Sequence, residues 1–248
     1  MADKIPAPDA APGIYEKVKS LLSDEMPGKI LDAPAGEGSF SLELKKSGYK
    51  VKAADLNQEK FKAEGIEFDK ADLNKELPYE NDFFDFAICI EGIEHLENPH
   101  HLIREFNRVL KSGGELILTT PNTLNVYSRL RYFLFGSPDR HHSEIESFRG
   151  SLYEVLRRHI NPVGYPELKF ILENNGFKIK IVTINDTVFS YHGGKKVLKI
   201  LLPPVFWLMG TLIRLVAGNI RKQDSLSGVL ISREILFGEA LIVKAVKV

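Results

Sequence analysis

The stretch Ile30–Phe40, "ILDAPAGEGSF", decides the fold. Two apolar residues and Asp32 read as the end of a buried strand, and the following turn of small residues carries Gly36 and Gly38. A helical pattern begins directly after the turn. Glycines let the backbone pass close to a ligand, and the first N–H groups of a helix attract negatively charged groups. The order strand, glycine turn, helix therefore predicts the first unit of a nucleotide-binding α/β fold.

Apolar runs and helical patterns continue to alternate along the chain. This alternation predicts a Rossmann-like sheet of about seven strands, mostly parallel, with helices on both faces and an antiparallel last strand. The predicted strands are Lys29–Ala33, Lys50–Asp55, Ile66–Asp72, Phe84–Glu91, Glu115–Asn122, Phe177–Ile184 and Gly238–Val248. The predicted helices are Ser39–Ser47, Gln58–Glu64, Pro99–Lys111 and Pro166–Asn175.

Length and composition favour a single domain over residues 1–248 on the cytoplasmic side of the cell. Lys and Arg total 33, as do Asp and Glu, so no overall charge favours nucleic acid as a partner. The one cysteine, Cys89, lies in an apolar run and cannot form an intrachain disulfide, which suits a reducing compartment. Residues 1–13 are rich in Pro and Ala and lack the apolar core of a secretory signal, so we expect a flexible leader. The oligomeric state stays open.

The glycine turn alone does not choose between two adenosine cofactors. Asp55, about twenty residues after the turn, fits the acid that accepts from ribose hydroxyls in dinucleotide enzymes. Asp32, however, would lie awkwardly beside a pyrophosphate and favours a ligand with positive charge. Asp72 offers an acceptor for an adenine amine, and Leu56 and Leu73 offer apolar walls around it.

Taken together, these motifs resemble those of the class I S-adenosylmethionine-dependent methyltransferases. The resemblance is carried by "ILDAPAGEGSFS", "AADLN", "KADLN", "FDFAICIEGIEHLENP" and "REFNRVLKSGGELILTTPN". It implies that Asp32 faces the methionine amino group, that Asp55 holds the ribose and that Asp72 holds the adenine. The backbone of the turn would pass beside the amino acid moiety of the cofactor. The further residues that the resemblance assigns to cofactor binding are Pro34, Ala35, Gly36 and Gly38 in the turn, and Glu91 after the fourth predicted strand. Pro34 departs from the glycine common in this family, so its position must require no amide donor.

The catalytic candidates are Glu91, Glu94 and His95, which follow the fourth predicted strand. Imidazole changes charge near neutral pH, so His95 is the favoured base for a hydroxyl acceptor, with the acids orienting it. The E-x-x-E-H spacing also resembles quinone-biosynthesis O-methyltransferases and small-RNA 2′-O-methyltransferases, in which such residues bind a divalent metal. His159 would then be a further ligand; hydrogen bonding alone remains the favoured role of the cluster. His141 and His142 lie in a polar loop and are expected to be solvated.

Two long segments, 123–165 and 187–236, interrupt the alternation and are expected to form the acceptor site. Ile200–Ile213 carries no charge, and no acid occurs from Thr187 to Gln223. A helical cap, a dimer contact and a segment lying on the inner face of a membrane all fit this pattern. Its basic flanks favour the membrane, with contact through 195–222: Lys195, Lys196, Lys199, Arg214, Arg221 and Lys222.

The sequence thus predicts an S-adenosylmethionine-dependent methyltransferase that O-methylates a hydrophobic, lipid-linked or membrane-associated small molecule. Two alternatives stay open: an NAD-dependent oxidoreductase, and a non-catalytic lipid- or partner-binding protein with the same fold. Methyl transfer to nitrogen or carbon is a further open alternative, because no residue identifies the acceptor.

Overall fold

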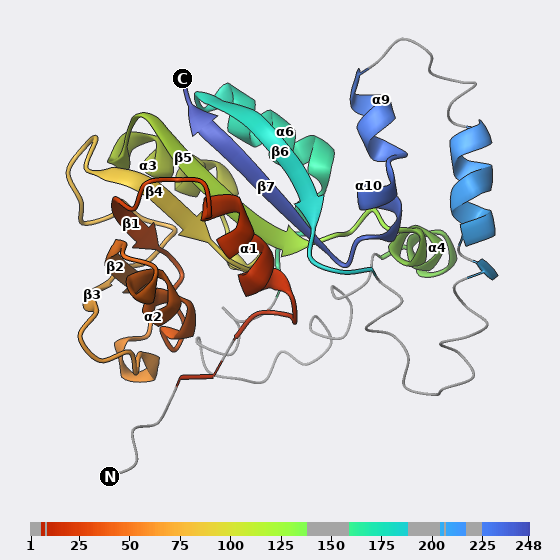
Figure 1. Ribbon diagram of the computed structural model, residues 1–248. Helices are drawn as coiled ribbons and strands as arrows, with labels where there is room; N and C mark the ends of the chain where they lie inside the picture. The colour runs from red at the N-terminus through yellow and green to blue at the C-terminus, as the bar shows by residue number, and fades with distance from the viewer. Residues whose placement is uncertain (1–5, 8, 138–158, 188–203, 206, 217–224) are drawn as a thin grey trace.

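The seven strands form one sheet in the order β3-β2-β1-β4-β5-β7-β6 (Figure 1). The computed structural model describes residues 6–7, 9–137, 159–187, 204–205, 207–216 and 225–248. All pairs from β3 to β5 are parallel, whereas β7 runs antiparallel to both β5 and β6. The strands are β1 Lys29–Asp32, β2 Lys50–Asp55, β3 Glu67–Lys70, β4 Phe84–Cys89, β5 Leu110–Pro121, β6 Phe177–Ile184 and β7 Ala240–Lys247. The predicted Rossmann-like fold class and its antiparallel last strand are confirmed.

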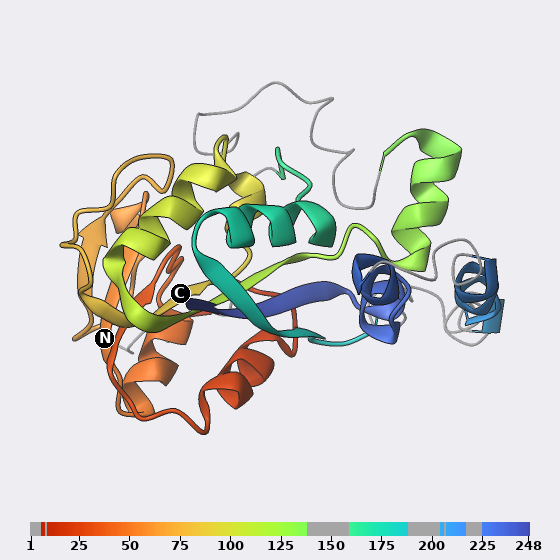
Figure 2. The ribbon, with the colours of Figure 1, turned by 90° about the horizontal axis from the view of Figure 1, so that it is seen from above.

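Helices cover both faces of the sheet, because side chains of a buried strand alternate between two apolar layers. Ile30 belongs to the apolar cluster with α1 and α2, while the next residue, Leu31, belongs to the cluster with α3 and α6. These two pairs of helices lie on opposite faces of the sheet (Figure 2). The helices are α1 Ile14–Leu22, α2 Ser39–Lys46, α3 Pro99–Val109, α4 Val126–Phe135, α6 Tyr165–Asn174, α9 Ser225–Leu230 and α10 Arg233–Phe237, with short 3₁₀ helices η1 Gln58–Lys60 and η2 Ile93–His95.

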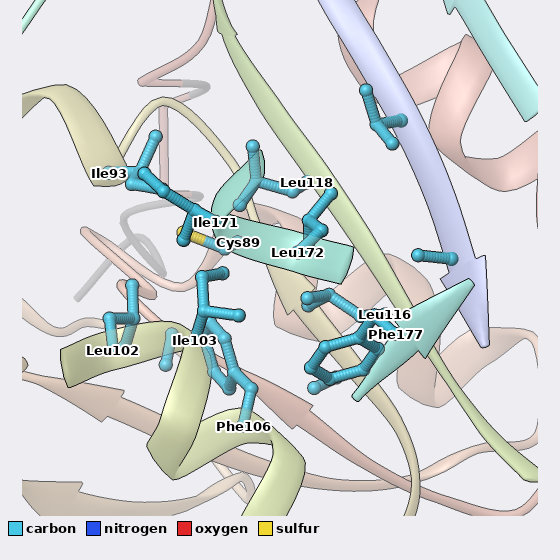
Figure 3. Close-up of a cluster of buried hydrophobic side chains, with 14 of the residues drawn as sticks. Cys89, Ile93, Leu102, Ile103, Phe106, Leu116, Leu118, Ile171, Leu172 and Phe177 are labelled. Atoms are coloured by element: carbon cyan, nitrogen blue, oxygen red, sulfur yellow. The ribbon is translucent and has the colours of Figure 1, made fainter. Parts of the chain in front are cut away.

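The larger layer is built on the apolar stripe of α3. Leu102, Ile103 and Phe106 are fully buried against Cys89 of β4 and Leu118 of β5 (Figure 3). Asn98 caps the helix by accepting a 3.0 Å hydrogen bond from the N–H of His101. Cys89 is thus a small core residue, as its apolar surroundings in the sequence predict.

Several predicted boundaries were wrong because strand partners set them. β3 ends at Lys70 and not at Asp72, since its partner β2 ends at Asp55, which pairs with Lys70. The helix predicted to reach Lys111 ends at Val109, and β5 begins at Leu110, which pairs with Phe84 of β4. The helix predicted over Gln58–Glu64 is only the 3₁₀ turn η1.

The two long segments flank the end of the sheet where β5 stops and β7 starts, since Pro121 pairs with Ala240. Within them the structure describes α4, α9, α10 and a helix at residues 207–216, which lie together beyond one side of the sheet (Figure 1). None of the helices described is both long and apolar enough to span a bilayer. His141 and His142 lie outside the described residues.

Candidate active site

Asp32 ends β1 at the carboxyl edge of the sheet and is 1% exposed. Its Oδ2 accepts a 2.5 Å hydrogen bond from the Ser41 hydroxyl. Burial raises the pKa of Asp32 to about 7; the bond from Ser41 opposes the rise, and the charge of Asp55 adds to it. A buried carboxylate of this kind favours a cationic group beside it, because the cation stabilises the ionised form.

The turn after β1 is held by backbone bonds to two neighbouring strands. Ala33 N–H donates to the carbonyl of Ile88, and Ala35 N–H donates to the carbonyl of Ala54. Gly38 has φ +87°, and a methyl group there would lie 2.5 Å from Cβ of Ala63. The turn therefore has a fixed course and requires glycine at this position.

Pro34 carries the turn toward the residues that follow β4. A methyl group on Gly92 would lie 2.4 Å from Cδ of Pro34, so the proline ring packs directly on the glycine backbone. The predicted cofactor turn and the predicted catalytic segment are thus in contact.

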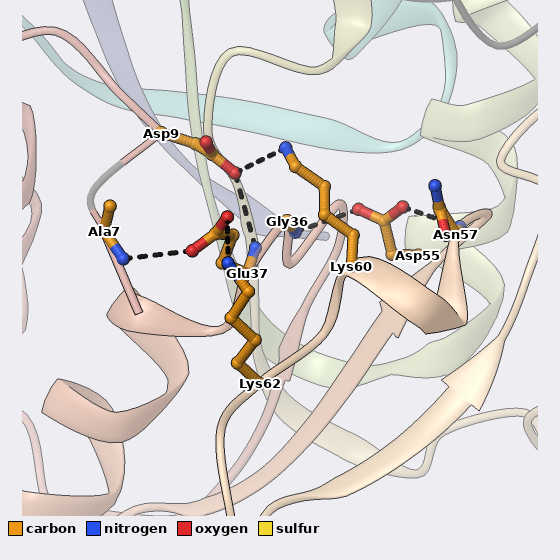
Figure 4. A network of polar contacts seen from close by, with 8 residues as sticks. All are labelled: Ala7, Asp9, Gly36, Glu37, Asp55, Asn57, Lys60 and Lys62. Atoms are coloured by element: carbon orange, nitrogen blue, oxygen red, sulfur yellow. Dashed lines mark hydrogen bonds and ion pairs between the residues drawn. The ribbon is translucent and has the colours of Figure 1, made fainter. Parts of the chain in front are cut away.

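Asp55 ends β2, as predicted, and its carboxylate is anchored on both oxygens. Oδ2 accepts from Gly36 N–H at 2.9 Å, and Oδ1 accepts from Asn57 N–H at 3.0 Å (Figure 4). Each carboxylate oxygen can accept a second bond, so these contacts orient the group without using up its acceptor capacity.

Asp72 lies two residues beyond β3, and its carboxylate accepts from Asn74 N–H at 3.0 Å. Leu73 beside it is buried, whereas Leu56 is 36% exposed. The predicted walls of an adenine slot therefore differ in exposure. Asn74, which the sequence analysis missed, accepts from Glu97 N–H at 2.9 Å and links this loop to the segment after η2.

Glu91 adopts φ +47°, a left-handed conformation that is uncommon outside glycine. Its N–H donates to the hydroxyl of Thr119 at 3.0 Å, and that hydroxyl lies 3.4 Å from Glu91 Oε1. Thr119 is a buried residue of β5 that the sequence analysis also missed. It holds the backbone at the point where the chain leaves β4.

Glu94, His95 and His159 come together although the two histidines are 64 residues apart in sequence. One ligand atom from each lies within 4.8 Å of the others, and the two imidazole rings meet edge-on with centroids 4.8 Å apart. Glu94 is fully buried, and its carbonyl accepts a 2.9 Å bond from Asn161 N–H. The side-chain amide of Asn161 donates to the Leu96 carbonyl at 2.9 Å, so Asn161 ties the chain two residues after His159 to the segment that carries Glu94 and His95. Glu91 is not a member of this group.

Part of the expected leader contacts the glycine turn. Asp9 Oδ2 accepts from Glu37 N–H at 3.3 Å and from Lys60 Nζ at 2.9 Å (Figure 4). Ala7 N–H donates to Glu37 Oε2 at 3.2 Å. Ala7 and Asp9, in the segment that composition predicts to be flexible, thus lie against the turn that the sequence assigns to the cofactor.

Tyr15 of α1 is a further residue that the sequence analysis missed. Its ring packs on Phe40 of α2 with centroids 4.7 Å apart. Burial raises the pKa of the Tyr15 hydroxyl above its usual range, and the nearby negative charge of Asp32 raises it further. Tyr15 therefore adds a neutral hydroxyl group near the buried carboxylate.

Comparison with known proteins shows the family to which the chain belongs. A family model described as a methyltransferase domain matches residues 10–181, which include every predicted cofactor and catalytic residue above. The chain belongs to the S-adenosylmethionine-dependent methyltransferases. This membership favours S-adenosylmethionine over the nicotinamide alternative that the glycine turn alone left open.

A ubiquinone biosynthesis O-methyltransferase of Rickettsia typhi is 30% identical to this methyltransferase over 200 residues, which cover 73% of the chain and 79% of the relative. Two solved structures share the fold: a methyltransferase from Archaeoglobus fulgidus (19% identity, TM-score 0.57, 94% of each chain) and a protein described as a putative methyltransferase from Bacillus halodurans (18% identity, TM-score 0.59, 94% of this chain and 98% of that one).

Proposed function

We propose that this methyltransferase methylates a hydroxyl oxygen of a hydrophobic, lipid-linked acceptor, with His95 as the base. The contact between Pro34 and Gly92 carries the proposal, because it joins the cofactor turn to the segment that presents His95. A base in this segment would lie near the cofactor turn, and proton removal during in-line methyl transfer requires a base near the reacting groups.

The residues at the ends of β1, β2 and β3 would hold the cofactor. S-adenosylmethionine, when bound, supplies a methyl group on a positively charged sulfur. Asp32 would accept from the methionine ammonium group, and Asp55, fixed by Gly36 and Asn57, would accept from the ribose hydroxyls. Asp72 would accept from the adenine amine beside the buried side chain of Leu73.

His95 would remove the acceptor proton as the oxygen attacks the methyl group. The neighbouring Glu94 carboxylate is fully buried and would stabilise the imidazolium that forms. His159 packs edge-on against the ring of His95 and restricts its orientation. Thr119 holds Glu91 at the start of this segment.

The same three side chains, Glu94, His95 and His159, also support a second role as ligands of a divalent metal. One carboxylate and two imidazoles are a donor set that zinc, manganese and iron accept. Ligand atoms on one zinc ion lie about 3 Å apart, so any pair of these atoms that is separated by nearly 4.8 Å would have to move closer. A metal there would lower the pKa of the acceptor hydroxyl. Titration calorimetry with Zn²⁺ and Mn²⁺ tests this role: saturable binding that Glu94→Gln abolishes supports it, and binding unchanged in that variant rejects it.

The acceptor class rests on the Rickettsia typhi relative, which is named for ubiquinone biosynthesis, and on the apolar segments beside the site. A quinone precursor with a prenyl tail has a ring hydroxyl to methylate and a tail that such segments would contact. Transfer to nitrogen or carbon would not require removal of a hydroxyl proton and would not give a methyl ether. The nature of the product therefore distinguishes these reactions from O-methylation.

The test is transfer of isotope-labelled methyl from S-adenosylmethionine into a lipid extract of a strain that lacks the gene. We expect label in a lipid that, in the deletion strain, is lighter by one CH₂, and release of that label by cleavage of a methyl ether. His95→Ala should lower the initial rate by a factor of about 10²–10⁴. His100→Ala is the matched control, because His100 lies on α3 and contacts Phe170 rather than the cluster. Equal rates in the two variants would reject His95 as the base.

A further inference from the structure

The carboxy-terminal half of α4 presents four consecutive large apolar side chains to solvent. The exposed fractions of Tyr132, Phe133, Leu134 and Phe135 are 61%, 84%, 58% and 65%. Four consecutive residues occupy all sides of a helix, so this end has no polar face. Burial of these side chains elsewhere would be strongly favourable.

The first half of α4 is firmly attached to the protein. Asn125 caps the helix through a 2.8 Å bond from Ser128 N–H, and Val126 is fully buried. The guanidinium of Arg129 donates to the carbonyls of Leu124 and Leu230 at 2.6 and 2.7 Å. The exposed half of α4 therefore extends into solvent from a half that is attached to the rest of the protein.

The helix at residues 207–216 has a second exposed apolar face. On its inner side Met209 and Ile213 pack with Phe237, and a methyl group on Gly210 would lie 2.5 Å from Cζ of Phe237. On its outer side Leu212 and Leu215 are 51% and 61% exposed. A helix at a water-facing surface usually carries polar residues on the side away from the core. This helix is apolar on both sides.

The charge of these two helices is positive. Arg129 of α4 and Arg214 of helix 207–216 each donate to a backbone carbonyl but keep their charge, α4 also contains Arg131, and neither segment contains an acid. Tyr132 and Trp207, the latter 64% exposed, have the amphipathic rings that are enriched where a membrane meets water. Apolar side chains with aromatic and basic neighbours complement a bilayer that contains anionic lipids.

The helices are also attached at the edge of the sheet that carries the site. α4 begins five residues after β5 ends at Pro121, and Pro121 pairs with Ala240 at the start of β7. The carboxyl ends of β1, β2 and β4, with Asp32 and Asp55, lie at this same edge, because β1, β2, β4 and β5 are parallel.

We propose that the exposed half of α4 and the outer face of helix 207–216 form a docking surface for an anionic lipid bilayer. The side chains that would enter the interface are Tyr132, Phe133, Leu134, Phe135, Trp207, Leu208, Leu212, Leu215 and Val216. Binding of this surface to a bilayer does not depend on methyl transfer. It can therefore be tested separately from the enzyme's activity.

Trp207 is the only tryptophan of the chain and reports directly on this surface. Its fluorescence is to be measured in the full-length protein with vesicles of phosphatidylcholine alone and of equal parts phosphatidylcholine and phosphatidylglycerol. We expect a blue shift and protection from a water-soluble quencher only with the anionic vesicles. High salt should weaken this binding, since the Debye length falls to about 3 Å at 1 M salt.

The double variant Phe133→Ser/Phe135→Ser should lower the vesicle partition coefficient about tenfold or more. Phe170→Ser is the matched control, because Phe170 is 59% exposed on α6, away from these helices. Equal losses in the two variants would overturn the proposal. So would a Trp207 shift that follows protein concentration and not lipid, because that result would assign the surface to a second copy of the chain.

Discussion

Pro34 and Gly92 are in direct contact: a methyl group on Gly92 would lie 2.4 Å from Cδ of Pro34. This contact joins the turn after β1 to the chain after β4, and so joins the proposed cofactor site to the proposed base. Gly92 has φ −125°, a backbone conformation open to any residue, so space and not backbone strain demands glycine here.

Gly92→Ala is therefore expected to push Pro34 aside. We predict a loss of about 1–3 kcal/mol in the free energy of unfolding and weaker binding of S-adenosylhomocysteine. Urea unfolding and calorimetry measure the two effects. Gly228→Ala is the control: nothing lies within 4 Å of a methyl group there, and alanine in α9 should be neutral or stabilising. If Gly92→Ala is as stable as the control, the contact does not constrain the turn.

Asp32 should make the ligand-free protein less stable as pH rises. Burial raises its pKa to about 7, above the value of about 3.9 in an unfolded chain. The folded state thus binds more protons between these two values, and the free energy of unfolding falls as pH increases through that window. Asp32→Asn removes this dependence, so the variant should be more stable than the wild type by about 1–3 kcal/mol near pH 8. If the free energies of unfolding of the wild type and of Asp32→Asn, measured with urea, change with pH in the same way, the raised pKa of Asp32 is contradicted.

The same carboxyl should link cofactor binding to proton release. A methionine ammonium group beside Asp32 favours its ionised form, so a proton leaves when the ligand binds below about pH 7. We expect the affinity for S-adenosylhomocysteine to rise with pH up to about 7 and then to level off. Asp32→Asn should bind more weakly and lose this dependence. Calorimetry in buffers with different ionisation enthalpies measures the released proton, and a heat that does not depend on the buffer would exclude the linkage.

Asp9 is predicted to protect one backbone amide of the glycine turn. Asp9→Ala removes the acceptor of Glu37 N–H, whereas Gly36 N–H keeps its bond to Asp55. Hydrogen exchange at Glu37 should accelerate, and exchange at Gly36 should not. The free energy of unfolding should change by less than about 1 kcal/mol, because the ion pair of Asp9 with Lys60 is partly exposed. Unchanged exchange at Glu37 would contradict the contact between Asp9 and the turn, and would favour the flexible leader that composition predicts.

The parts of the molecule that the sequence predicts correctly depend on local pattern. The buried strand β1 follows from a short apolar run, and the stripe of α3 from Leu102 to Phe106 follows from apolar residues at helical spacing. Asp32 and Asp55 could be placed at strand ends because each directly follows an apolar run.

The parts that it missed depend on partners far away in the chain. β3 stops at Lys70 because β2 offers no further residue to pair with, which no local pattern records. Asp9 meets Lys60 across 51 positions, and the Pro and Ala residues around Asp9 carry no periodicity. In the sequence, Thr119 is indistinguishable from any other residue of a buried strand. Only the fold brings its hydroxyl beside Glu91.

The most direct measurement is calorimetric titration of S-adenosylhomocysteine into the wild-type protein and into Asp55→Asn, with Asp69→Asn as the control. Asp55 joins the turn and β2 through Gly36, whereas Asp69 lies on β3 in an ion pair with Lys52. The wild type and Asp69→Asn should bind with equal affinity, and Asp55→Asn should bind at least about tenfold more weakly. A wild-type protein that does not bind, or an Asp55→Asn variant that binds as tightly as the control, would contradict the proposed cofactor site.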